Sequence, residues 1–147
     1  MNYKIEQKLD EWSFKVEQEN LITWSNVLND PNPIHLDNKI VKKLGLGDKC
    51  INQGPANIAY ILNCISSNFK EYQLIEVKNK LNGNVFSGDK IVVEGKISGI
   101  ENHENFLIIS LLLVLNTQNQ SSVLLTEAKI RIPNHWFWVK NIFNMYM

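Results

Sequence analysis

The pattern of apolar and polar residues differs between the two halves of the chain. Over residues 12–17 apolar and polar side chains alternate, which predicts a half-buried strand. Over residues 19–28 apolar side chains recur at helical spacing, which predicts a short amphipathic helix. Asp37 is a good N-cap for a second short helix, which we expect to end at Gly45 or Gly47.

The most helical stretch begins at Gly54 and Pro55. Proline suits the first position of a helix because its missing N–H group would have no partner there in any case. From residue 56 to residue 69 the apolar side chains cover a broad surface. This breadth predicts a helix that is buried on most sides.

The second half of the chain has the pattern of strands separated by short connections. The predicted strands cover residues 74–80, 91–97, 106–115 and 123–132. The connections are rich in Asn, Gly and Ser, and their shortness favours antiparallel neighbours. The third strand is apolar on both faces, as expected for a central strand covered on both sides, although its length would also suit a helix. Together these elements predict an α+β fold with the sheet curling round the helix.

Composition narrows the class of protein. The chain has 147 residues, which predicts a single domain over 1–147, and its 15 basic and 15 acidic residues balance. A nucleic-acid partner is not expected, because there is no basic excess and Arg131 is the only arginine. No apolar run is long enough for a membrane span. Cys50 and Cys64 fit neither a disulfide framework nor a metal motif, so we expect a soluble, reduced, cytoplasmic protein.

The candidate chemistry lies in the loop from residue 29 to residue 37. Pro31 and Pro33 stiffen this loop, since proline has a fixed φ and no N–H group. Asp30 and His35 are a carboxylate and an imidazole, the side chains suited to acid–base work on one water molecule. The alternative is a solvated turn in which Asp30 caps a helix end and His35 is an ordinary surface histidine.

The stretch Asp30-Pro31-Asn32-Pro33-Ile34-His35 resembles the signature loop of the MaoC-like, (R)-specific enoyl-CoA hydratases, whose pattern is Gly-Asp-x-Asn-Pro-hydrophobic-His. Residues 85–89 resemble that family's Phe-x-Gly-Asp turn, and the whole resemblance spans about residues 12–133. Two positions depart from the pattern. Asn29 replaces a glycine and Gln53 replaces a histidine found in many members.

The resemblance implies a hot-dog fold, in which a curved antiparallel sheet wraps a long central helix, usually in a homodimer or higher homo-oligomer. It implies reversible addition of water to a trans-2-enoyl thioester of coenzyme A or acyl carrier protein, giving the (R)-3-hydroxyacyl product. No metal or organic cofactor is implied. Asp30 and His35 would hold and activate the water and pass a proton to the neighbouring carbon, and Asn32 would brace the loop.

Gly54 is a third catalytic candidate. An unpaired amide at the start of a helix, where the dipole favours negative charge, would stabilise an enolate-like thioester oxygen. Alternatively, Gly54 only turns the chain into the helix. We also take Asn32, Gln53 and Asn57 as candidate substrate-binding residues, although burial of Asn57 against a neighbouring carbonyl is equally consistent with the pattern.

Two other functions remain open from the sequence. A hot-dog thioesterase generally needs a carboxylate near or on the central helix, and residues 55–70 contain no Asp or Glu. A non-catalytic subunit that binds acyl thioesters would not need Asp30 and His35. The aromatic tail, residues 134–147, is expected to pack on the protein's own sheet or on a partner subunit rather than at a membrane.

Overall fold

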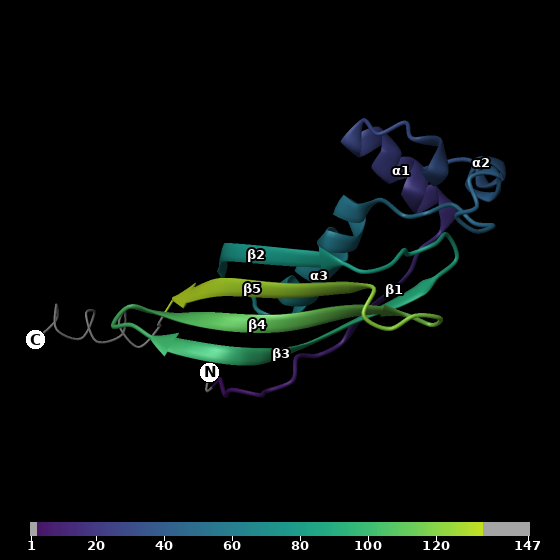
Figure 1. Cartoon of the computed structure of the whole chain (residues 1–147). Coiled ribbons are helices and arrows are strands. Elements are labelled where there is room, and N and C mark those ends of the chain that lie inside the picture. Colours follow the sequence, from purple (N-terminus) through teal and green to yellow (C-terminus); the bar gives the residue numbers. More distant parts are fainter. Residues whose placement is uncertain (1–2, 134–147) are drawn as a thin grey trace, which may run out of the picture.

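A computed structural model describes residues 3–133 of the chain, and the aromatic tail of residues 134–147 lies outside them. Five strands form one antiparallel sheet in the order β1-β3-β4-β5-β2, and α1 and α2 lie together at one end of it (Figure 1). The elements are β1 (Trp12–Lys15), α1 (Gln18–Leu28), η1 (Pro33–His35, a 3₁₀ helix), α2 (Asn38–Lys43), α3 (Gly54–Asn68), β2 (Gln73–Leu81), β3 (Lys90–Asn102), β4 (Phe106–Thr117) and β5 (Leu124–Pro133).

The central strand of the sheet is β4, as its apolar sequence predicts. Its alternate residues Ile109, Leu111, Leu113 and Leu115 are buried in the core shared with α3. The other face of β4 is less covered, and Leu112 is 41% exposed there. The expectation that both faces of this strand are covered is therefore wrong for the single chain, because the helix packs on one side of the sheet.

The connection between β2 and β3 also differs from the prediction. The two strands are not neighbours, since β2 lies at one edge of the sheet and pairs with β5. The connecting segment bonds instead to distant parts of the chain. The Ser87 amide donates to the Cys50 carbonyl (2.8 Å) and the Gly88 amide donates to the Val16 carbonyl (2.6 Å). These long-range bonds satisfy backbone groups that a hairpin would pair locally.

The helix α3 is buried or half-buried over most of its surface, as its sequence predicts. Ala56, Tyr60, Ile61, Cys64 and Ile65 pack into the core. On the remaining surface Ile58 and Leu62 are partly buried, while the polar residues of the helix's last turns are exposed. A partly covered apolar stripe on an otherwise central helix leaves room for a further contact.

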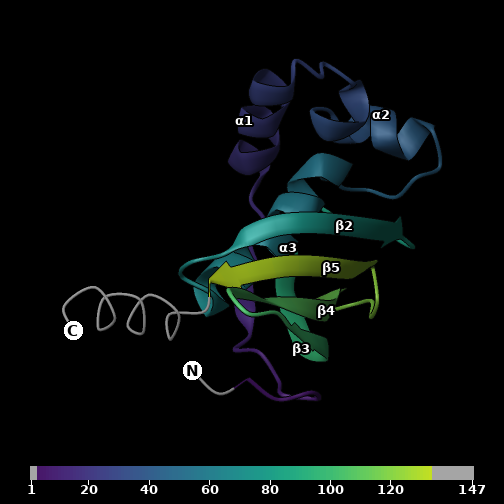
Figure 2. The ribbon, with the colours of Figure 1, turned by 90° about the vertical axis from the view of Figure 1, so that its left-hand side faces the viewer.

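We call residues 18–53, which contain α1, η1 and α2, the cap (Figure 2). Asn29 ends α1 in the left-handed conformation (φ 50°, ψ 44°), which asparagine tolerates better than most residues. Asp37 is the N-cap of α2, and its side chain accepts from the Lys39 amide (2.8 Å). Just after α2, Gly45 has φ 71°, as expected for a helix stop. Among the helices of residues 3–133, none is long and apolar enough to cross a membrane.

Candidate functional site

Asp30 and His35 lie together in the loop between α1 and α2. The Asp30 Oδ2 and His35 Nε2 atoms are 3.3 Å apart. The His35 side chain is 8% exposed and the Asp30 side chain 40% exposed. The pair thus has one partner fixed in the interior and one that meets solvent, as a site that admits water and substrate requires.

The backbone of the loop holds Asp30 in place. The Asp30 amide donates to the Ser25 carbonyl (2.9 Å), and the Ser25 hydroxyl donates back to the Asp30 carbonyl. Asn32 braces the turn from the other side. Its backbone amide donates to Asp30 Oδ1 (3.3 Å), and its side-chain oxygen accepts from the Ile34 backbone amide (3.3 Å). The aspartate is therefore oriented by local bonds on both sides.

The imidazole of His35 is fixed by a segment far away in the sequence. Its Nδ1 lies 2.6 Å from the Ile51 carbonyl oxygen. A carbonyl oxygen only accepts hydrogen bonds, so Nδ1 carries the proton and Nε2 points toward Asp30. The Gln18 side chain donates to the His35 carbonyl (3.0 Å), and the Ile51 amide donates to the Ile34 carbonyl (3.0 Å).

Gly54 begins α3 only three residues after Ile51, whose carbonyl holds the imidazole. Three residues span at most about 11 Å, so Gly54 lies within about that distance of Ile51. The Gly54 amide has no hydrogen-bond acceptor among residues 3–133. A Cβ at this position would contact Leu81 Cδ2 at 3.5 Å, an ordinary distance, so glycine here is not required by packing.

Gln53 and Asn57, two candidate substrate-binding residues, have buried side chains. Gln53 donates through Nε2 to the Leu21 carbonyl (2.9 Å), which ties α1 to the start of α3. Its Oε1 atom has no hydrogen-bond partner within the described part of the chain. Asn57 accepts a hydrogen bond from Asn52 Nδ2 (2.7 Å). Both side chains thus take part in the interior contacts that position α3.

Three residues of the site are not identified by sequence reasoning: Ser25, Gln18 and Ile51. Ser25 carries a weak signal, because a serine occurs on the buried side of the last turns of an amphipathic helix. Ile51 acts through its backbone carbonyl, and Gln18 acts across 17 residues. Both contacts end on a backbone carbonyl, which every residue has, so no pattern of residue types along the chain predicts them.

The turn at residues 85–89 supports the segment that leads to Gly54. Asp89 is buried, and its carboxylate accepts from the Phe86 amide (2.9 Å) and from Gln118 Nε2 (2.8 Å). The Asn52 amide donates to the Val85 carbonyl (2.7 Å). The motif singled out by the sequence is therefore a structural support for the site.

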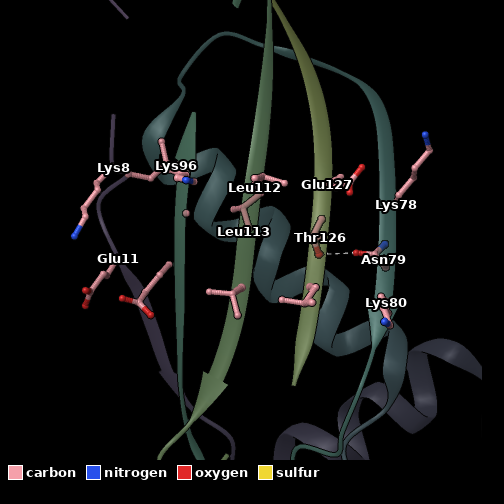
Figure 3. Close-up of a pocket in the computed structure, with 15 residues that line it drawn as sticks. Lys8, Glu11, Lys78, Asn79, Lys80, Lys96, Leu112, Leu113, Thr126 and Glu127 are labelled. Carbon is pink, nitrogen blue, oxygen red and sulfur yellow. Dashed lines mark hydrogen bonds between the residues drawn. The ribbon is translucent and has the colours of Figure 1, made fainter. Parts of the chain in front are cut away.

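A groove lies elsewhere, on the face of the sheet turned away from α3 (Figure 3). This groove of about 640 Å³ is lined by Leu112, Val114 and Leu125, with charged side chains such as Lys78 and Glu127 around them. Neither Asp30 nor His35 belongs to it. Among residues 3–133, no group of three or more His, Cys, Asp and Glu side chains is placed to hold a metal ion.

No protein-family model and no curated protein matches the sequence. Solved structures do match the fold. An (R)-hydratase from A. caviae involved in PHA biosynthesis superposes with a TM-score of 0.80 at 18% identity, over 88% of this chain and 97% of that one. The chain has the hot-dog fold.

Further similar structures carry related names. The R-hydratase PhaJ1 from Pseudomonas aeruginosa has a TM-score of 0.74 at 21% identity, over 89% of this chain and 83% of that one. A MaoC-like dehydratase from Rhodospirillum rubrum has a TM-score of 0.76 at 16% identity, over 89% and 93%. The fold implied by the Asp30–His35 motif is thereby confirmed.

Proposed function

We propose that this protein is a MaoC-like hydratase that reversibly adds water to a trans-2-enoyl thioester and gives the (R)-3-hydroxyacyl thioester. The observation that carries the proposal is the Asp30–His35 pair, 3.3 Å apart and fixed by backbone bonds on both sides. The names of the structures with the same fold, which are R-hydratases and a MaoC-like dehydratase, support it.

The orientation of the pair explains how it would act on water. With its Nδ1–H group bonded to the Ile51 carbonyl, His35 has Nε2 left to exchange a proton with the substrate water, and the Asp30 carboxylate beside it accepts hydrogen bonds. A water molecule bound beside the pair can donate a hydrogen bond to it and lose one proton to it. When the water oxygen bonds to C3 of the enoyl group, the proton it loses to the pair is returned to C2, so the water is added in full and no cofactor is consumed.

The Gly54 amide would bind the thioester carbonyl oxygen. Negative charge grows on this oxygen as the C2–C3 double bond accepts the water oxygen, and an unpaired amide at a helix start stabilises that charge. Asn32 and Gln53 would serve the site indirectly, Asn32 by bracing the loop and Gln53 by tying α1 to α3. Asn57 would hold the same region through Asn52.

The direct test uses crotonyl-CoA and follows enoyl absorbance and free thiol together. Loss of the enoyl absorbance without thiol release is the expected result. Thiol release would indicate a thioesterase, and binding of the thioester without either signal would indicate a non-catalytic subunit. Either of these outcomes contradicts the proposed reaction.

We further propose that the protein forms a homodimer through β2 and α3. Within residues 3–133 the outer edge of β2 has no strand partner, and Leu74, Ile75 and Leu81 are 38%, 50% and 50% exposed. The partly buried apolar stripe of α3 adds Ile58 and Leu62. An unpaired, apolar edge strand favours pairing with a second chain.

Sedimentation tests the dimer and its interface. The wild-type protein is expected at twice the monomer mass, and Ile75→Lys is expected to shift it toward the monomer because it places a charge in the interface. Leu112→Lys, on the outer face of the sheet, is the matched control and should leave the dimer intact. If only the Leu112 variant dissociates, the dimer contact lies on the outer face of the sheet, and the proposed interface through β2 and α3 is wrong.

A further inference from the structure

The cap carries an exposed surface that combines lysines with large apolar side chains. We call Lys39, Lys42, Lys43, Leu44, Leu46 and Lys49 the α2 surface. Leu44 is 57% exposed and Leu46 is 43% exposed, and all four lysines are exposed. Exposed apolar side chains with polar residues around them are typical of a surface that meets another protein.

The α2 surface is also the place where positive charge collects. Residues 36–50 contain four lysines and two aspartates, a net charge of +2, whereas the whole chain has a net charge of +0. Lys39, Lys42 and Lys43 share the side of α2 that faces away from the buried Val41. None of these lysines has an ion pair within the described residues, unlike Lys15, Lys78 and Lys96 on the sheet.

This surface adjoins the candidate active site. Asp37, which caps α2, comes two residues after His35, and α2 packs on η1. A partner bound to the α2 surface would therefore lie next to the segment that carries His35.

We propose that the α2 surface binds a small acidic carrier protein, which presents the enoyl group as a thioester of its phosphopantetheine arm. The proposal rests on the proposed hydratase function. Clustered lysines attract an acidic partner and speed its approach, and the exposed leucines supply an apolar centre for the contact.

A nucleotide phosphate fits this surface less well than a protein does. Arg131, the one arginine of the chain, belongs to β5 and not to the cap. Its Cζ lies 4.1 Å from the centre of the Phe106 ring. Asp37 already occupies the amide of Lys39 at the start of α2 and brings a negative charge there. The leucines would gain nothing from a phosphate, whereas they can be buried against a protein helix.

The test compares three crotonyl thioesters: crotonyl-pantetheine, crotonyl-CoA and crotonyl-loaded acidic acyl carrier protein. For the wild-type protein, kcat/KM is expected to be at least tenfold higher for the carrier thioester than for crotonyl-pantetheine. Lys42→Glu with Lys43→Glu should lower this ratio about tenfold, since steering by charge depends on the sign of the patch. The control, Lys90→Glu with Lys129→Glu, makes the same change of charge on the sheet and should keep the ratio.

Each other outcome counts against the proposal. Equal ratios for the two double variants, or a loss confined to crotonyl-CoA, would overturn carrier binding while leaving the hydratase in place. If no thioester is hydrated, the proposed function fails by itself. Fluorescence anisotropy with labelled carrier protein then decides the docking separately: binding weakened by the Lys42–Lys43 variant supports it, and no binding overturns it. Circular dichroism checks that each variant is folded.

Discussion

The candidate site in the cap and the outer face of the sheet both carry titratable side chains, but these side chains are held differently. On the outer face the charged groups pair with one another at the surface, as Lys96 does with Glu6 (2.7 Å) and Lys78 with Glu76 (3.0 Å). In the candidate site, by contrast, backbone groups hold both side chains: Asp30 Oδ1 accepts from the Asn32 backbone amide (3.3 Å), and His35 Nδ1 lies 2.6 Å from the Ile51 carbonyl oxygen. Exposed ion pairs orient a side chain weakly, whereas bonds to the backbone fix it.

For locating the catalytic site, the way the side chains are held matters more than the volume of the groove. The outer groove has a volume of about 640 Å³, yet Asp30, His35 and Gly54 are all absent from its lining. Catalysis by proton transfer needs groups within hydrogen-bond reach of one water molecule, and a roomy apolar groove does not supply them. We therefore place the chemistry in the cap, and the following variants test that placement.

The largest expected effect comes from the pair itself. Asp30→Asn and His35→Ala should each lower kcat/KM for crotonyl-CoA by about a hundredfold or more, because each removes one proton acceptor. His35→Gln can still donate to the Ile51 carbonyl and serves if the alanine variant is unstable. Glu127→Gln, in the outer groove, is the control and should keep full activity. Near-normal activity of the Asp30 and His35 variants would remove the assigned role.

A methyl group at the start of α3 should have the next largest effect. Gly54→Ala is expected to lower kcat/KM at least tenfold by keeping the thioester oxygen from the amide, with the free energy of unfolding unchanged within about 1 kcal/mol. Gly99→Ala is the matched control on the sheet, because its Cβ would meet Ser110 at 3.5 Å, the distance that Leu81 has from Gly54. Equal activity of the two variants would contradict the oxyanion role.

The rates at which the two cysteines are alkylated measure how easily the cap, which contains Cys50, opens relative to the core under the sheet, which contains Cys64. Burial raises the pKa of the Cys64 thiol to about 11, and burial also raises the pKa of Cys50. At pH 8 both thiols stay protonated, so alkylation of the native protein should be slow. We expect Cys50 to react severalfold faster than Cys64, through local opening of the cap, as measured by mass spectrometry. Faster reaction of Cys64 would contradict this order.

The smallest expected effect is on the outer face. Leu112→Ser removes an apolar side chain that is 41% exposed, so kcat/KM for crotonyl-CoA should change less than twofold. An activity assay beside thermal unfolding checks this. A tenfold loss of kcat/KM with an unchanged midpoint of thermal unfolding would show that the groove takes part in the reaction. It would contradict the placement of the chemistry in the cap.

Local patterns predicted much of the fold and the centre of the site. Asp30 and His35 are five residues apart in a loop stiffened by two prolines, so their proximity follows from chain geometry. The strands and the long helix follow from periodicity and from the turn residues between them. The position of β2 next to β5 did not follow, because strand order depends on contacts between distant segments, and a short connection indicates only that its ends are close.

The sequence by itself determined which residues could carry the chemistry and which segments would be helix or strand, because these depend on residue type and spacing along the chain. Only the tertiary structure decided which nitrogen of His35 is protonated, since its acceptor belongs to Ile51, 16 residues away. It also decided that one face of the sheet and one stripe of α3 stay open in the single chain. Burial and hydrogen bonding are properties of packed neighbours, and periodicity does not say which neighbours those are.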